Sequence, residues 1–314
     1  MAMNTSNIVL PKKVAAAIRT KVKDSSTIAA LSPKEGKLFT DESYLVFDGA
    51  AEAEVVAEGA AKSDYVQPIA PVVANRATIQ TTTRVSKQLK WADEDDQLEI
   101  VSAIQDDQAE AMARAIDYLT YHAVDPLSGT ALNSYTALSA ESSVNHIYLG
   151  KALASATDNE LIVSIDDLAD AVNDEYDING FALAKSYANA LRKIRVQSTM
   201  MRLYPEIPLN LKVGSIEGIN ASCSGTVNGR RVKNNTSPVT YGTNILGIMG
   251  DFSLTRWGFV RDITAEVIEY GDPDGKGDLK RYNQIAFRSE AVLAWAVIDP
   301  AAFAILHSGT NPNA

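Results

Sequence analysis

The 314-residue sequence has one cysteine, Cys223, and only three histidines. A single cysteine excludes a disulfide within the chain and any zinc site built on cysteine. The histidines, His122, His146 and His307, lie far apart in the sequence and beside no nucleophile, so we expect core or surface positions for them. No phosphate-binding loop, dinucleotide-binding fingerprint or G-x-S-x-G nucleophile elbow occurs. We therefore expect no catalytic residue, no cofactor and no enzyme activity.

Basic residues and long apolar runs are also scarce. The chain has 29 Lys and Arg against 39 Asp and Glu, a formal charge of −10, which disfavours general nucleic-acid binding. The longest apolar run, 291–306, is cut by Asp299-Pro300 and is too short to span a bilayer. Lys12 and Lys13 interrupt the place where a secretory signal needs an apolar stretch, so we expect a cytoplasmic protein. The length fits one large domain or two ordinary ones with a real core.

The charge is unevenly distributed along the chain. Residues 1–40 hold seven basic and two acidic residues, whereas residues 93–125 hold ten acidic residues and one arginine. This division predicts contacts between a basic arm and an acidic helix, within a subunit or between copies. The alternative is two separate solvated surfaces.

The pattern of the first third of the chain predicts an arm followed by β-structure. Residues 12–22 fit a short helix, but the segment to about 36 lacks the apolar periodicity to fold alone. Residues 73–86 alternate with period two and predict a long strand, with 44–56 as its hairpin partner. So weakly apolar a hairpin is unstable alone, which favours packing against the rest of the chain or a neighbouring molecule over an ordinary surface hairpin.

The clearest element is a helix over 93–124. Asp93 can cap it, and acidic residues in the first turn suit the helix dipole. No Gly or Pro interrupts it before Pro126, so it is about 45 Å long. Only one face is apolar, which predicts a helix lying along the outside of a sheet. That stripe comprises Leu98, Val101, Ile104, Met112, Ala115, Leu119 and His122, with Gln108 filling its gap.

The remainder reads as α/β and then β. Ser164 is expected to cap a helix with Ile165, Leu168, Val172 and Tyr176 on its apolar stripe. A buried strand at 180–184 precedes a second helix, 187–195, capped by Ser186. Long strands at 257–270 and 280–288 flank a turn at 271–279, and 291–298 is a final buried strand.

Two polar segments invite a binding interpretation. The turn GDPDGKGD spaces Asp272, Asp274 and Asp278 like a calcium loop. Pro273 and Lys276 spoil that pattern, and Asn283 stands where a bidentate Glu is required, so a hairpin turn is favoured. The other segment, 228–237, could hold phosphate, but a solvated loop is favoured. Its bases are Arg230, Arg231 and Lys233.

In this order the parts resemble the major capsid proteins of tailed bacteriophages with the Hong Kong 97 type of fold, particularly those of actinobacterial phages. The resemblance runs from residue 8 to residue 306, and each piece is weak without the others. The sequence segments that carry the resemblance are STIAALSP, VVAEGAAKS, VSKQLKWADEDDQLEIV, GSIEGI, GIMGDFSLTRWGFVRDITAEVIEYGDPDG and AVLAWAVIDPAAFAIL.

The resemblance implies an α+β fold with named regions. The arm and the hairpin would both reach across neighbouring subunits, which accounts for their lack of a core. The regions are an N-terminal arm (N-arm, 1–36), an extended β-hairpin (E-loop, 37–90), a spine helix (91–126) of the peripheral or P-domain, an axial or A-domain (127–255), a P-domain hairpin (256–289) with its tip at 271–279, and a final A-domain strand with the C-terminus (290–314).

The function implied is that of a shell protein. Copies would form hexamers and pentamers that close into an icosahedral capsid around double-stranded DNA, without sequence-specific DNA binding and without a membrane. Assembly would occur in the bacterial host cytoplasm, with a portal and with separate scaffolding or decoration proteins left open as partners. The expected interface residues are Lys12, Lys13, Arg19, Lys21 and Lys23 of the arm, Glu58 and Lys62 near the E-loop tip, and Asp272, Asp274 and Lys276 of the P-domain tip.

The sequence differs from some members of the resembled family in two features, and each difference leads to an expectation. Some relatives cross-link an E-loop lysine to a P-domain asparagine. Here Lys62 is the only lysine near the tip and Asn283 lies beyond the P-domain turn, so we expect no cross-link. Some relatives also carry a cleaved scaffolding extension, whereas this sequence begins almost at the arm, so we expect a separate scaffold or none.

Two alternatives remain. An encapsulin-like nanocompartment has the same fold but encloses enzymes, and neighbouring portal and terminase genes would favour the phage. An α/β hydrolase with an acidic cleft would be a monomer with turnover.

Overall fold

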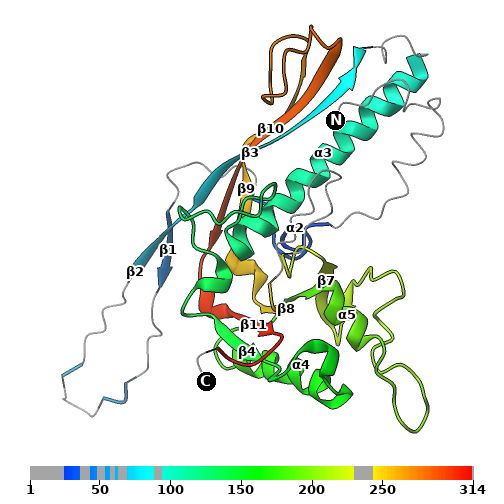
Figure 1. Ribbon diagram of the computed structural model, residues 1–314. Helices are drawn as coiled ribbons and strands as arrows, with labels where there is room; N and C mark the ends of the chain where they lie inside the picture. The colour runs from blue at the N-terminus through cyan, green and yellow to red at the C-terminus, as the bar shows by residue number, and fades with distance from the viewer. Residues whose placement is uncertain are drawn as a thin grey trace.

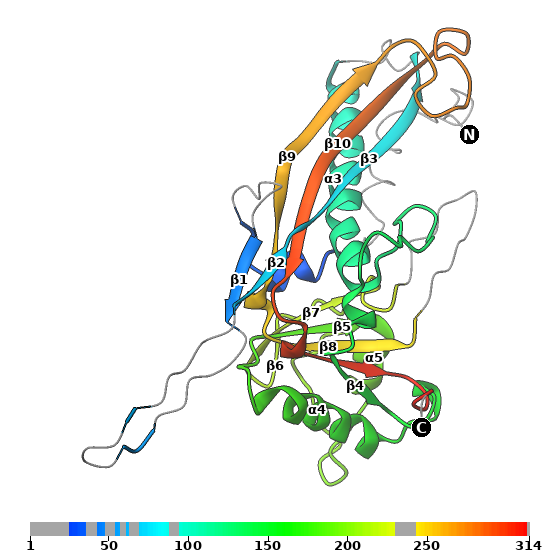
Figure 2. The ribbon, with the colours of Figure 1, turned by 90° about the vertical axis from the view of Figure 1, so that its left-hand side faces the viewer.

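The computed structural model describes residues 25–35, 43–47, 54–56, 61–62, 69–87, 94–229 and 243–312. Two sheets and one long helix dominate it (Figures 1 and 2). A narrow three-stranded sheet rises at one end with the helix beside it, and a six-stranded sheet with two shorter helices fills the other. The fold is therefore α+β, as expected. No described helix is long and apolar enough to cross a membrane.

The three-stranded sheet is antiparallel, in the order β3-β10-β9. Its strands are β3 (Asn75–Ser86), β9 (Thr255–Ile268) and β10 (Gln284–Val297). Helix α3 (Glu94–His122) runs along this sheet and contacts β10 and β3, which confirms a long helix against a sheet (Figure 2).

The apolar stripe of α3 is confirmed from Ile104 onward. Ile104, Met112 and Leu119 are buried, as are Ala115 and His122. Gln108, 2% exposed, fills the gap by hydrogen bonding. Its amide nitrogen donates to Thr83 Oγ1 at 3.1 Å and to the Phe287 carbonyl at 3.0 Å, while its oxygen accepts from the Ser289 hydroxyl at 2.7 Å. Asp93 and the side chains of Leu98 and Val101 lie outside the described part of the chain.

The predicted pairing of 44–56 with the long strand is wrong. β1 (Ser43–Phe47) pairs with β2 (Ile69–Val73), and Ala74 separates β2 from β3. All twelve residues of β3 pair instead with β10, from Asn75 opposite Trp295 to Ser86 opposite Gln284. That ladder joins segments about 200 residues apart, so no local pattern could reveal it.

The predicted strands 280–288 and 291–298 are in fact a single strand, β10, and residues 280–283 belong to the preceding turn. Two polar residues, at positions 289 and 290, separate the two predicted strands. However, Ser289 is buried and donates to Gln108, and Glu290 forms an ion pair with Arg261 at 3.5 Å. Both polar groups have partners, so the strand continues through them and across the predicted boundary at 289/290.

The six-stranded sheet has the order β4-β11-β8-β5-β7-β6. Parallel pairs join β4 to β11 and β5 to β7, and the remaining pairs are antiparallel. Its strands are β4 (Asn145–Tyr148), β5 (Gly180–Ala184), β6 (Ser215–Ile216), β7 (Ile219–Ser224), β8 (Ile245–Gly250) and β11 (Phe303–His307).

Helices cover both faces of this sheet. On β5, Phe181 and Leu183 join the core formed with α4 (Asp158–Asn173) and α5 (Lys185–Leu191). Ala182 and Ala184 join the core that contains Met112, Ile116 and Leu119 of α3. All five residues of β5 are buried, which confirms the predicted strand. Short 3₁₀ turns lie at Leu138–Ala140, Leu153–Ser155, Phe252–Leu254 and Pro300–Ala302.

The predicted caps of the two shorter helices, Ser164 and Ser186, are wrong. Thr157 caps α4 in a full capping box with Glu160. Ser164 lies inside the helix, where its hydroxyl donates to the Leu161 carbonyl at 2.8 Å and bonds Tyr187 Oη at 2.7 Å. α5 follows β5 directly with Ala184 as its N-cap, so Ser186 falls within its first turn, and the helix ends at Leu191. Ile165, Leu168 and Val172 are buried as predicted, whereas Tyr176 lies beyond the end of α4.

Candidate assembly surfaces

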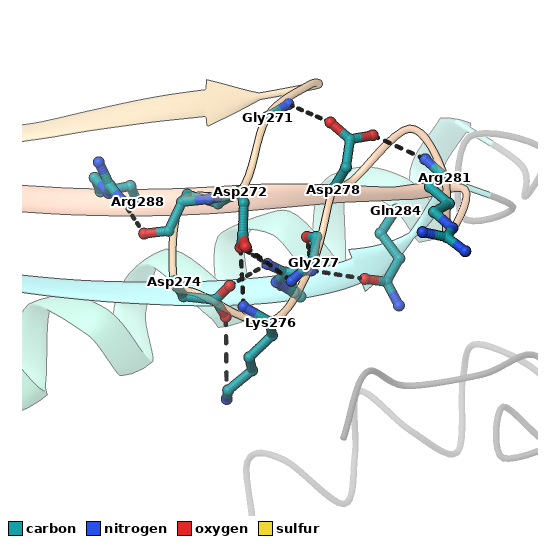
Figure 3. Close-up of polar contacts among 11 residues, drawn as sticks. Gly271, Asp272, Asp274, Lys276, Gly277, Asp278, Arg281, Gln284 and Arg288 are labelled. Atoms are coloured by element: carbon teal, nitrogen blue, oxygen red, sulfur yellow. Dashed lines mark hydrogen bonds and ion pairs between the residues drawn. The ribbon is translucent and has the colours of Figure 1, made fainter.

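The expected interface residues are only partly described. Lys12, Lys13, Arg19, Lys21, Lys23 and Glu58 lie outside the described residues. Lys62 is exposed. The remaining three, Asp272, Asp274 and Lys276, lie together in the turn between β9 and β10, at the free end of the three-stranded sheet (Figures 2 and 3).

The two aspartates of this turn bind an internal cation. The Arg84 guanidinium, from β3, donates through Nη2 to Asp272 at 2.8 Å and to Asp274. Through Nη1 it donates to the Gly277 carbonyl at 2.9 Å and to Gln284 Oε1 at 3.3 Å. The Arg84 side chain is 7% exposed, so the turn closes over it. The sequence also allowed a calcium loop, but two of its three candidate ligands, Asp272 and Asp274, bind the Arg84 guanidinium.

Further hydrogen bonds fix the turn from within (Figure 3). Asp272 accepts from the backbone N–H groups of Gly277 and Lys276, each at 2.9 Å. Those bonds, together with Arg84, lower the pKa of Asp272. Asp278 accepts from the N–H of Gly271 at 3.2 Å and of Arg281 at 2.9 Å. The hairpin turn is thereby confirmed. Two of its predicted interface residues, Asp272 and Asp274, have their charges neutralised by Arg84 within the subunit.

Exposed side chains surround this closed turn. The Lys276 side chain is 69% exposed, while Tyr270 and Tyr282 are 71% and 55% exposed. Tyrosine is enriched in protein–protein interfaces, so the two exposed rings make this turn a candidate contact surface. Lys276 is among the residues predicted from the sequence, whereas neither tyrosine was predicted.

Replacing Arg84 with alanine should loosen the turn. Asp272 and Asp274 would lose their shared cation, and the Lys276 and Gly277 amides would lose a fixed acceptor. We expect hydrogen exchange of those two amides to become at least about tenfold faster. Arg84→Lys should give an intermediate rate, because an ammonium group lacks the fork that reaches four acceptors. Unchanged exchange in Arg84→Ala would show that the turn is held by its backbone alone.

A second polar centre lies where the arm meets α3. Asp117 is completely buried. Its carboxylate accepts hydrogen bonds from the Ser26 hydroxyl at 2.6 Å and from the backbone N–H groups of Thr27 at 2.8 Å and Ile28 at 3.2 Å. The Thr27 hydroxyl at 3.1 Å and the Thr226 hydroxyl also donate. Burial raises the pKa of Asp117, and the hydrogen bonds oppose that shift.

Asp117 thus connects three parts of the chain: the arm segment with α2 (Ile28–Leu31), helix α3, and the loop after β7. The predicted meeting of arm and acidic helix occurs within the subunit at this point. The donors are hydroxyl and backbone groups, however, not the arm lysines. Nothing in the sequence predicts this role, because Asp117 is one of ten acidic residues in the segment 93–125.

Two of the three histidines, His146 and His307, lie closer together than their sequence positions suggest. His146 Nδ1 and His307 Nε2 are 2.9 Å apart, because β4 and β11 pair in parallel. The Tyr148 ring stacks on His307 with centroids 4.8 Å apart. Burial, with the adjacent His146, lowers the pKa of His307 to about 4. This pair was missed because its strands lie 161 residues apart in sequence.

His122, at the end of α3, is buried as expected. Its Nε2 lies 3.0 Å from the Thr226 carbonyl, next to the Asp117 centre. Burial lowers its pKa to about 4. In the described part of the chain, no three His, Cys, Asp or Glu side chains gather as metal ligands.

Comparison with known proteins places this geometry in a family. The model of the phage capsid family matches residues 6–308. A chain from Mycobacterium phage Ogopogo is 32% identical, with a TM-score of 0.76, over 92% of this chain and 94% of that one. A chain from Gordonia phage Cozz is 23% identical, with a TM-score of 0.72, over 98% and 94%.

A third structure, described as the capsid of an empty GTA particle, shares the fold. It is 16% identical, with a TM-score of 0.61, over 98% of this chain and all of that one. No curated protein matches the sequence. The family match spans nearly the whole chain, and both sheets and the long helix fall inside it. The chain belongs to the phage capsid family.

Proposed function

We propose that this chain is a major capsid protein, whose copies assemble through hexamers and pentamers into the icosahedral shell of a tailed phage. The observation that carries the proposal is the family match over residues 6–308. A chain from a mycobacterial phage that is 32% identical over 92% of this chain supports it. The chain acts as a structural protein rather than an enzyme.

The regions of the fold suggest how the subunit is divided. The three-stranded sheet with α3 would be the P-domain, and the six-stranded sheet with α4 and α5 the A-domain. The β1–β2 pair would be the base of the E-loop, and 25–35 the end of the N-arm. Because β10 continues to Val297, we place the return to the A-domain after residue 297, not at 290.

The shell would enclose double-stranded DNA without binding it tightly. A charge of −10 supports this, because an acidic protein does not neutralise phosphates. A portal would complete the particle, and separate scaffolding or decoration proteins are left open as further partners. Assembly would take place in the cytoplasm of the bacterial host, and the mature protein would reside in the virion.

Two measurements test the proposal. Sedimentation of the purified protein should show particles far larger than the 33.8 kDa subunit. Particles isolated from the cells that produce them should be treated with nuclease, which removes DNA outside the shell. When they are then opened, they should release protected double-stranded DNA. An enzyme cargo without DNA would favour the nanocompartment, and a monomer with hydrolytic turnover would favour the hydrolase.

A further inference from the structure

A short hairpin-like loop, residues 194–203, follows α5 and carries exposed apolar side chains. Two backbone bonds close its base, from Leu203 N–H to the Ile194 carbonyl at 3.1 Å and from Val196 N–H to the Met201 carbonyl at 2.9 Å. At its tip, Met200 adopts a φ of +57°, and its N–H donates to the Val196 carbonyl at 2.8 Å. The loop is therefore a defined structure. The segment after α5 projects from the lower end of the molecule (Figure 1).

The tip of this loop is apolar and open to solvent. Met200 and Met201 are 70% and 68% exposed, and Val196 and Leu203 are 36% and 37% exposed. Residues 196–201 contain no charge, but Arg195 and Arg202 flank them. Methionine adapts its shape to a partner surface, and a cluster of exposed apolar side chains marks a contact site.

The same half of the molecule is divided by charge. Residues 158–184 hold eight acids and no base, whereas 185–212 hold six bases and one acid. On α4, Val163, Asp167 and Asp170 are exposed at helical spacing and form one stripe. Within the described residues, neither aspartate forms an ion pair, and neither do Arg195 and Arg202. The acidic stripe on α4 and the two arginines of the loop are therefore complementary in charge, and neither has an ion-pair partner within the described part of the subunit.

We propose that the 194–203 loop of one copy binds the Val163–Asp167–Asp170 stripe of the next copy around each ring. Arg195 and Arg202 would face the two aspartates, and the methionines would cover Val163, which is 42% exposed. Two different patches on each copy form a head-to-tail contact, and such a contact generates a closed ring when the rotation from one copy to the next closes. This inference rests on the proposed shell function and identifies the partner as a second copy of this chain.

Charge reversal tests the contact. Arg195→Glu/Arg202→Glu and, separately, Asp167→Lys/Asp170→Lys should each lower the particle yield at least about tenfold, because like charges would meet. The chain with all four reversals should recover the yield, since the charges again oppose. Glu175→Lys/Asp177→Lys, just beyond α4, is the matched control and should assemble normally. Circular dichroism checks that every variant folds.

The outcomes separate this inference from the proposed function. If wild-type protein forms neither particles nor rings of five and six subunits, the shell function itself fails. If wild-type protein forms particles and either double reversal leaves their yield unchanged, the ring contact is wrong and the shell function stands. Failure of the four-reversal chain to assemble, with both double reversals folded, would also overturn the pairing. Met200→Ser/Met201→Ser should reduce the yield without changing its salt dependence.

Discussion

Replacing Asp117 with alanine should destabilise the subunit by about 3–5 kcal/mol, because each buried donor left without an acceptor costs about 1–3 kcal/mol and removing a buried charge offsets part of that cost. The carboxylate accepts hydrogen bonds from Ser26, Thr27, Ile28 and Thr226, all within the core. Alanine would leave these donors buried without an acceptor. It would also create a cavity beneath α2.

The arm should respond more than the rest of the subunit. We expect hydrogen-exchange protection of residues 26–31 to be lost in Asp117→Ala, while β5 and β8 stay protected. Denaturant titration gives the free energy of unfolding. Thr226→Ala removes one donor and keeps the carboxylate, so it should cost only about 1 kcal/mol. Wild-type stability and arm protection in Asp117→Ala would contradict the anchoring role.

Lowering the pH should destabilise the fold through His122. Burial lowers the pKa of His122 to about 4, whereas an unfolded histidine titrates near 6.5. Below pH 6.5 the unfolded chain binds the proton first, so stability is complete above 6.5 and is lost as pH falls toward 4. The full loss is about 3 kcal/mol.

The measurement is the free energy of unfolding at pH 7.0 and pH 4.5 for wild type and His122→Gln. Glutamine does not titrate but retains a donor toward the Thr226 carbonyl. The variant should lose less stability on acidification than the wild type. His307 adds a change of the same sign in both proteins, because its pKa is also lowered to about 4, and so cancels in the comparison. Equal losses would exclude His122 as a source of the pH dependence.

Local patterns in the sequence predicted the elements well. The period of the stripe on α3 and the uninterrupted run before Pro126 predicted the helix within a residue or two. The small and apolar run of 180–184 predicted β5 with its bounds, because a strand buried on both faces needs no polar side. The glycine-rich turn of 271–279 was equally clear, since its chemistry is local.

Errors arose where the partner of a residue lies far along the chain. Ser164 fits a capping pattern, but the true cap is Thr157, because Ser164 satisfies its hydroxyl inside the helix against Tyr187. The pairing of β3 with β10 and the role of Arg84 depend on contacts across about 200 residues. Asp117 carries no local sign that it is buried. Such roles are set by tertiary packing, which periodicity does not encode.

The central claim is that copies of this chain assemble with one another into the rings that build a closed shell. Negative-stain electron microscopy of the purified protein tests it most directly. We predict closed, icosahedrally symmetric particles, or isolated rings of five and six subunits where a scaffold is required to close them. A uniform population of monomers, with neither rings nor particles, would contradict the claim.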